Sequence, residues 1–204
     1  MGEPVKAVVF DVGNVLVRWD RRLPFVGHFA DEAELDWFMD TVIPLDWHML
    51  HDAGRPAAEL VAERSALFPG HADLIRDWFD RFNESIPGPV PGSPELVEAL
   101  HRAEVPLFAI TNFGADTWAG FRPTFPLMDL FGDIVVSGIE KIAKPDAAIF
   151  DLAAGRFGLH PEAMLFIDDS LPNIESASAL GWQVHHFSDA EGLSADLRAR
   201  GLID

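Results

Sequence analysis

Short apolar runs that each stop at a polar residue, with helical patterns between them, constrain the fold of this chain most. Val5 to Phe10 is rich in β-branched residues and ends at Asp11. Four later runs share this character: Val105 to Ile110 before Thr111, Ile134 to Val136 before Ser137, Met164 to Ile167 before Asp168, and the weaker Gln183 to Phe187. Runs of this length and composition predict buried strands.

Helical patterns separate these strands. Ser93-Pro94-Glu95 predicts a helix start, with the Ser93 hydroxyl as cap and proline in the first turn, and the helix runs to about Arg102. Asp146 to Phe157 and Leu171 to Leu180 predict two more helices, each followed by glycine. The alternation predicts an α/β fold with a Rossmann-like parallel sheet. Ligands bind beyond the carboxyl ends of such strands, which is where the polar residues gather.

The stretch from Asp20 to Ser85 breaks this rhythm and contains no convincing strand. Helical spacing recurs at 31–42, 56–68 and 71–82, and a stretch rich in proline and glycine follows from Ile86 to Pro94. We therefore predict a core domain of residues 1–17 and 91–204 with an inserted helical cap domain of residues 18–90. The cap would cover the site as a lid; helices that only cover the sheet are the alternative.

Charge and composition narrow the partners. The net charge of −18 disfavours nucleic acid and anionic membrane surfaces. The absence of cysteine excludes disulfides and thiolate chemistry. The sequence shows no signal peptide and no apolar run of the ~20 residues that span a bilayer, so we expect a cytoplasmic protein. Lysine is scarce, with only Lys6, Lys141 and Lys144, so Lys144 stands out as a local positive charge.

Four segments carry residues suited to chemistry: Val8 to Leu16 around Asp11, Ile110-Thr111-Asn112, Lys144-Pro145-Asp146, and Leu165 to Ser170 followed by Asn173. Their order and spacing resemble the four motifs of the haloacid dehalogenase (HAD) superfamily, and the insert resembles its type-1 cap. The resemblance covers nearly the whole chain. The motif from Phe10 to Val15 is most similar to that of the branch containing glucose-1-phosphate phosphatase-like enzymes and the N-terminal phosphatase domain of epoxide hydrolases.

This resemblance implies a Mg²⁺-dependent hydrolase that removes phosphate from a small phosphorylated metabolite, sugar phosphates included. Asp11 would be the nucleophile and form an aspartyl-phosphate. Asp11, the carbonyl of Gly13 and Asp169 would hold Mg²⁺, with Asp168 as a direct or water-mediated helper. A charge pair favoured by the start of a helix is the ordinary alternative for Asp168 and Asp169.

The resemblance also implies a phosphate-binding group. Thr111 and Asn112 would bind the phosphate, and Lys144 would offset negative charge on both the phosphate and Asp11. The ordinary alternatives are a strand-to-helix cap for Thr111 and a surface lysine before a proline turn for Lys144.

Gly13 departs from the family pattern, because phosphatases of this superfamily usually carry a second Asp there that protonates the leaving group. General acid–base catalysis typically contributes ~10²–10⁴-fold in rate. His48 and His51 are candidate substitutes, although a surface position is the more ordinary expectation for both. Arg55, in the same stretch, could bind a second anionic or hydroxyl-rich part of the substrate.

Two other functions compete with the phosphatase hypothesis. A 2-haloacid dehalogenase would use the same Asp11 without a metal, and it tolerates Gly13. A scaffold that binds a phosphorylated ligand without turnover is the other alternative, and Gly13 is its only support. The sequence leaves the substrate and the oligomeric state open.

Overall fold

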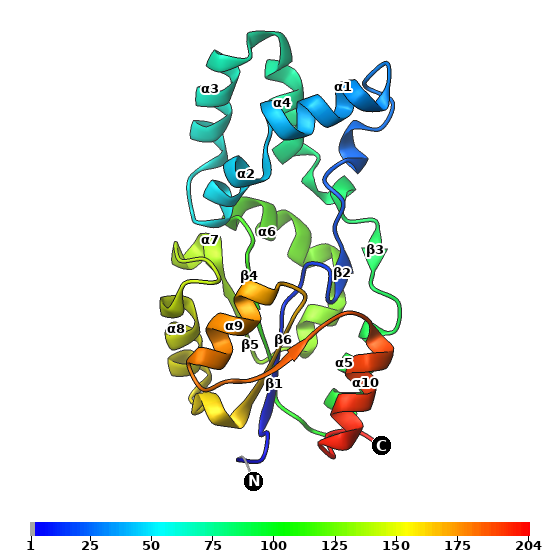
Figure 1. Cartoon of the computed structure of the whole chain (residues 1–204), viewed down its shortest axis with the longest axis vertical. Helices are drawn as coiled ribbons and strands as arrows, with labels where there is room; N and C mark the ends of the chain where they lie inside the picture. Colours follow the sequence, from blue (N-terminus) through cyan, green and yellow to red (C-terminus); the bar gives the residue numbers. More distant parts are fainter. Residues whose placement is uncertain (1–2) are drawn as a thin grey trace.

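The computed structural model describes residues 3–204 and shows two parts, an α/β core and a helical part above it (Figure 1). The core sheet consists of β1 (Ala7–Phe10), β4 (Leu107–Thr111), β5 (Asp133–Val136), β6 (Met164–Asp168) and β7 (Gln183–His186). Its strand order is β5-β4-β1-β6-β7 and every pairing is parallel. All five predicted strands and the predicted α/β class are therefore confirmed.

Alternate residues of β1 pack on opposite faces of the sheet, as the two-residue period of a strand requires. Ala7 and Val9 join one core with α8 (Ala147–Phe157) and α9 (Leu171–Ala179). Val8 and Phe10 join the other core with α5 (Ser93–Arg102) and α10 (Ala190–Ala199). Because both faces of β1 are buried, the strand reads as a continuous apolar run.

The three helices predicted for the core form within one or two residues of the expected bounds. Asp146 caps α8 by accepting from the Ala148 N–H at 2.9 Å. The predicted capping hydroxyl of Ser93 is wrong, since Gly92 precedes the helix at φ 86° and Ser93 is already its first residue. The remaining core helices are α6 (Ala115–Phe121) and the short α7 (Ser137–Glu140).

The inserted segment contains α1 (Glu32–Trp37), α2 (Leu45–Asp52), α3 (Ala57–Leu67) and α4 (Ala72–Asp80). A π-helical turn, Phe38–Val42, extends α1, so the three predicted helices are confirmed. The helix α2 was not predicted. Short 3₁₀ turns occur at Leu23–Phe25, Pro69–His71, Phe82–Ser85, Arg122–Thr124, Pro126–Leu130 and Pro161–Ala163. Phe25 packs edge-to-face on Phe38 and stacks on Trp78, and these aromatic side chains belong to the same buried cluster as Val8 and Phe10 of β1.

A two-residue antiparallel ladder lies where the chain enters and leaves the inserted segment. β2 (Val17–Arg18) pairs with β3 (Gly88–Pro89), Val17 opposite Pro89 and Arg18 opposite Gly88. We propose that this ladder marks the boundary of the cap domain near residues 18 and 90. No helix within residues 3–204 combines the length and apolar character needed to span a bilayer.

Candidate active site

Asp11 lies directly after β1, at the carboxyl edge of the sheet. Its backbone N–H donates to the Ile167 carbonyl at 2.8 Å, which ties it to the end of β6. β1 and β6 are adjacent in space, whereas the chain leaves β1 to build β4 and β5 on its other side. This reversal of strand order is the place where parallel sheets bind ligands.

Lys144 joins two of the predicted carboxylates. Its Nζ lies 2.9 Å from Oδ1 of Asp11 and 2.7 Å from Oδ2 of Asp168. The side chain is only 2% exposed, so the predicted alternative of a surface lysine is wrong. Burial opposes its charge, but the Asp11 and Asp168 carboxylates more than offset burial and raise the pKa of Lys144. Lys144 therefore carries a fixed positive charge beside Asp11.

Asn112 holds Lys144 in place through the backbone. Its Nδ2 donates to the Lys144 carbonyl at 2.9 Å, and its Oδ1 accepts from the Lys144 N–H at 2.8 Å. Both polar atoms of the amide therefore contact Lys144. Asn112 lines the site as predicted, and its observed contacts position the lysine; its predicted contact with phosphate stays a prediction.

Asp168 is fully buried behind the site, and its oxygens are well supplied with donors. Oδ1 accepts from the Ser170 N–H at 2.8 Å and Oδ2 accepts from Lys144. Nδ2 of Asn173 lies 3.0 and 3.1 Å from the two oxygens. The repulsion expected between Asp168 and Asp169 is thus offset partly by Lys144. These contacts favour Asp168 as the anchor of Lys144 over a role as a direct metal ligand.

The carboxylate donor atoms of Asp11, Asp168 and Asp169 all lie within 4.8 Å of one another. Burial raises the pKa of Asp169, and the Asp168 charge adds to the effect, while Asn14 and Lys144 oppose it. Burial likewise raises the pKa of Asp11. Three carboxylates share a single lysine here, so the local charge stays negative. This donor set of oxygens fits a divalent cation such as Mg²⁺.

A cleft of about 590 Å³ opens above these carboxylates. Asp11, Gly13 and Asp169 line it together with Asn112 and Lys144. Thr111 ends β4 and is buried, and it does not appear among the lining residues, so its predicted contact with phosphate remains untested by this geometry. Of the predicted site residues, Asp11, Lys144 and Asp169 therefore line one cleft.

The inserted segment and the loops beside it give the cleft an apolar wall. The apolar lining residues are Val17, Trp19, Leu45, Met49, Phe82, Ile86, Phe113, Pro145 and Pro172. Among the described residues of the lining, Lys144 is the only lysine or arginine. The cleft thus offers one fixed positive charge at its base and a largely apolar surface above it.

The predicted surface positions of His48 and His51 are wrong, because both side chains are 2% exposed. His48 lines the cleft and accepts from Nε1 of Trp78 at 3.1 Å. His51 packs against the core, with Nε2 2.7 Å from Asp116. Arg55 also differs from expectation, since it pairs with Glu59 and Glu63 and does not line the cleft.

Asp52 lines the cleft and was not predicted as a site residue. It is the last residue of α2, it is buried, and its Oδ2 lies 3.5 Å from Nε2 of His48. Ser137 Oγ donates to its backbone carbonyl at 2.6 Å, which fixes the end of α2 on the core. A Cβ on Gly114 would lie 1.9 Å from Nε2 of His51, so glycine is needed there for the two parts to approach this closely.

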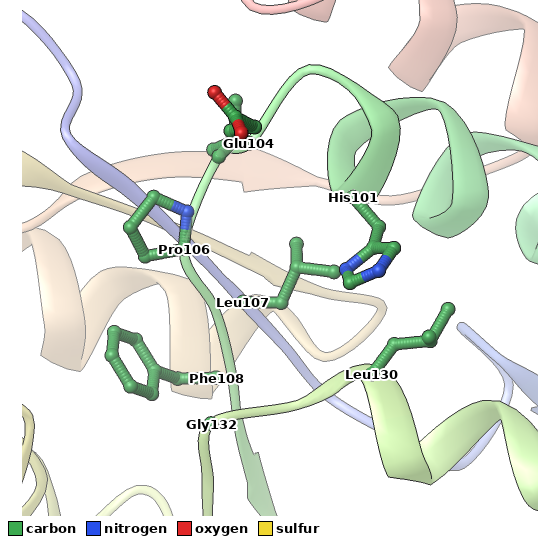
Figure 2. Close-up of a pocket in the computed structure, with 8 residues that line it drawn as sticks. His101, Glu104, Pro106, Leu107, Phe108, Leu130 and Gly132 are labelled. Atoms are coloured by element: carbon green, nitrogen blue, oxygen red, sulfur yellow. The ribbon is translucent and has the colours of Figure 1, made fainter.

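A second hollow of about 430 Å³ lies at the opposite end of β4 (Figure 2). His101, Pro106, Leu107, Phe108 and Gly132 line it with Glu104, Val105 and Leu130. It faces the amino end of the strand and lies apart from the carboxylates. No group of three potential metal ligands occurs there within the described part of the chain.

Comparisons with known proteins agree with this geometry. The family model of haloacid dehalogenase-like hydrolases matches residues 5–181. A sesquiterpene phosphatase of Aspergillus oryzae is 25% identical over 95% of both chains, and a validoxylamine A 7′-phosphate phosphatase of Streptomyces hygroscopicus is 25% identical over 98% of this chain and 95% of its own. A HAD family enzyme of Bacteroides thetaiotaomicron, solved with magnesium and inorganic phosphate, superposes with a TM-score of 0.72 at 21% identity, covering 91% and 95% of the two chains.

Proposed function

Because the chain belongs to the haloacid dehalogenase-like hydrolase family, we propose that it is a Mg²⁺-dependent phosphatase of small phosphate monoesters. One observation carries this proposal: Asp11 lies 2.9 Å from a buried lysine and within a group of three carboxylates, at the base of a cleft. The relatives named as phosphatases support the same reaction class.

Asp11 would attack the phosphorus atom and form an aspartyl-phosphate as the bond to the leaving oxygen breaks. Its Oδ1 accepts from the Val12 N–H and contacts Lys144, so the carboxylate is held in one orientation. Water would then attack the aspartyl-phosphate, releasing phosphate and restoring Asp11. Holding the nucleophile in place matters because enzymes lower the barrier to phosphoryl transfer mainly by positioning the reactants and by stabilising charge.

Asp11, Asp169 and the carbonyl of Gly13 would hold Mg²⁺, which would neutralise the phosphate and orient it for attack. Asp168 would act through Lys144, which offsets charge on Asp11. Thr111 and Asn112 would contribute donors to the phosphate from the end of β4. These roles are proposals that follow from the predicted site and from the contacts around Lys144.

The apolar wall of the cleft bears on the substrate. A second anionic group would find no lysine or arginine beyond Lys144 among the described lining residues. Leu45 and Met49, two of the residues of α2 that line the cleft, are 46% and 47% exposed, and apolar substrate surface would cover them. We therefore propose a phosphate ester with an apolar body, and expect sugar phosphates, the sequence-based preference, to be poorer substrates.

A phosphate-release panel tests this function. Aryl, alkyl and terpenyl monophosphates, sugar phosphates and phosphoglycolate are compared with and without Mg²⁺, and Asp11→Asn is the control. Mg²⁺-dependent release that favours the apolar esters and disappears in Asp11→Asn is the expected result. Absence of release from every ester, with halide released from a 2-haloacid in the absence of metal, would establish the dehalogenase alternative instead.

A further inference from the structure

The side chain at position 13 cannot transfer a proton, because it is glycine. Departure of a basic alkoxide needs a proton, and the attacking water later needs a base. The titratable side chains that line the cleft are Asp11, His48, Asp52, Lys144 and Asp169. Three of these have other proposed roles. Asp11 is the nucleophile, Asp169 is a metal ligand, and Lys144 is the positive charge between Asp11 and Asp168.

His48 is not suited to the role. Its Nδ1 accepts from the Trp78 indole N–H, so the ring proton is on Nε2. Burial lowers the pKa of His48 to about 3, and His51 and Arg21 add to this effect. The ring therefore stays neutral near pH 7, with neither an acidic proton to give nor a free lone pair at the cleft. His51 does not line the cleft and is engaged by Asp116 and the Arg55 carbonyl.

Asp52 has the placement that the reaction needs. Asp52 lines the same cleft as Asp11 but comes from the inserted segment, on α2. The backbone N–H of Gly114 faces the Asp52 carboxyl from the core, and Nε2 of His48 lies 3.5 Å from Oδ2. Ser137 holds the Asp52 carbonyl. The carboxyl is therefore flanked by His48 and the Gly114 N–H, while Ser137 fixes the backbone of the same residue.

Several charged groups near α2 have partners other than Asp52. Arg21 donates to the Ile43 carbonyl, and the Lys141 side chain lies beside Gly54. Arg55 pairs with Glu59 and Glu63, His51 with Asp116, and Arg156 with Glu140. Lys144 is the one cation whose charge acts on Asp52, and it is held by two carboxylates of its own. Within the described residues, the only basic side chain in contact with the Asp52 carboxyl is His48, which is neutral. No ion pair therefore holds Asp52 in its charged form, and its carboxyl can exchange a proton.

We propose that Asp52 is the general acid and general base of this enzyme and takes the place of the side chain that Gly13 lacks. The inference rests on the proposed phosphatase function. The proton would thus be transferred by a residue of the inserted segment and not by the residue at position 13, which usually transfers it in phosphatases of this family.

The protons balance across the two steps. In the first, Oδ2 of Asp11 bonds to phosphorus, the bond to the leaving oxygen breaks, and the protonated Asp52 carboxyl gives its proton to that oxygen. An alcohol leaves and Asp52 becomes a carboxylate. In the second, water attacks the aspartyl-phosphate and gives a proton to Asp52, while the bond from phosphorus to Asp11 breaks. Inorganic phosphate leaves and Asp52 is protonated again.

Electrostatics supports this cycle. Burial raises the pKa of Asp52 from 3.8 to about 7, while Gly114 and Lys144 limit the rise. A catalytic acid works best when its pKa lies near the working pH, because both protonation states are then accessible. Perturbed carboxyls in clefts are also typical of functional sites.

The test is the dependence of kcat/KM on the leaving group in Asp52→Asn. The amide keeps the shape but cannot donate a proton, so kcat/KM for an alkyl phosphate should fall by about 10²–10⁴-fold. For p-nitrophenyl phosphate, whose leaving group departs as a stable anion, kcat/KM should fall less than about tenfold. This aryl ester should also give a burst of product, because water lacks its base in the second step. Asp46→Asn, an exposed carboxylate on the same helix, is the matched control and should change neither ester.

Two further measurements separate chemistry from folding. The wild-type kcat/KM for the alkyl ester should decline above pH 7 as Asp52 loses its proton, and Asp52→Asn should remove this decline. Asp52→Glu, which keeps the acid, should recover part of the alkyl rate if Asp52→Asn folds poorly. Equal losses for alkyl and aryl esters, or no loss, would overturn the role of Asp52. A wild-type protein that releases no phosphate from any ester would instead overturn the proposed function.

Discussion

Replacing Asp52 with Asn should stabilise the folded protein, and the gain should grow with pH. In the folded state, burial raises the pKa of this carboxyl from 3.8 to about 7. The folded protein therefore binds the proton more tightly than the unfolded chain does. The contribution of Asp52 to the stability of the wild type is greatest while Asp52 is protonated in both states, and this contribution declines as pH rises from about 4 through about 7. Asn carries no proton equilibrium and lacks this decline.

The size of the effect follows from the shift. One pKa unit corresponds to about 1.4 kcal/mol, so the full penalty of ionising Asp52 in the folded state is about 4 kcal/mol. About 3 kcal/mol of it develops between pH 5 and pH 8. We expect the free energy of unfolding of Asp52→Asn, relative to wild type, to rise by roughly this amount across that interval.

Urea unfolding of both proteins without added metal, followed by far-UV circular dichroism at pH 5 and pH 8, measures the difference. Asp46→Asn removes an exposed carboxylate from the same helix and controls for the loss of a negative charge. A stability difference that stays constant between the two pH values would refute the reasoning, because it would mean that Asp52 titrates alike in the folded and unfolded states. A gain in stability combined with lost turnover is the pattern expected of a residue kept for catalysis.

Four more predictions concern the core of the site. Asp11→Asn should abolish phosphate release, since the amide is not a nucleophile, and should leave the circular dichroism spectrum unchanged; turnover within tenfold of wild type would contradict the assignment. EDTA should abolish release and Mg²⁺ should restore it, whereas undiminished turnover after dialysis against chelator would argue against a metal. Lys144→Ala should reduce kcat by at least about 10³-fold, which single-turnover rates measure. The same change should lower the free energy of unfolding by about 3–5 kcal/mol, measured by urea unfolding, because Asp11 and Asp168 lose their common cation. Gly13→Asp in the Asp52→Asn background should recover alkyl phosphate turnover, because a Cβ at position 13 meets no atom within 4 Å; no recovery would mean that a carboxylate there cannot reach the leaving oxygen.

The sequence predicted the fold well because the three central strands, β4, β1 and β6, are buried on both faces. The run from Val5 to Phe10 has no alternation and ends in a carboxylate, which is typical of a parallel strand beside a ligand site. Asp11 and Lys144 were identified for related reasons: one closes such a strand, and the other is one of only three lysines. Both lie at the base of the cleft.

The helix α2 was missed because its buried residues do not form an apolar stripe. Trp47, His48, His51 and Asp52 are all buried, and three of the four are polar. Polar residues at these positions read as surface from the sequence, which is why His48 and His51 were misplaced. Their burial depends on tertiary partners, namely Trp78 for His48 and Asp116 for His51. A local pattern cannot contain that information.

Asp52 had no signal for the same reason. An isolated carboxyl in a helical insert is ordinary, and the hydrogen-bond partners of Asp52, Gly114 and Ser137, lie far along the chain. Asn112 and Asp168 were predicted as site residues, but the sequence could not show that both contact Lys144. Motif spacing identifies which residues gather, whereas the hydrogen bonds between them decide the division of roles.

The strand order determines when during synthesis the central strand can pair. β1 is the first strand made and lies at the centre of the sheet, yet Val8 pairs with Leu107 on one side and with Leu165 on the other. Both neighbours of β1 are therefore present only after most of the chain has been synthesised. Pairing between strands this far apart in the sequence is slow to form. Truncated products that end before β6 contain Asp11 but lack both Asp168 and the strand that would bury Val8 and Val9. We therefore expect chains that end before β6 to be inactive and to expose the apolar flank of β1 to aggregation and proteolysis.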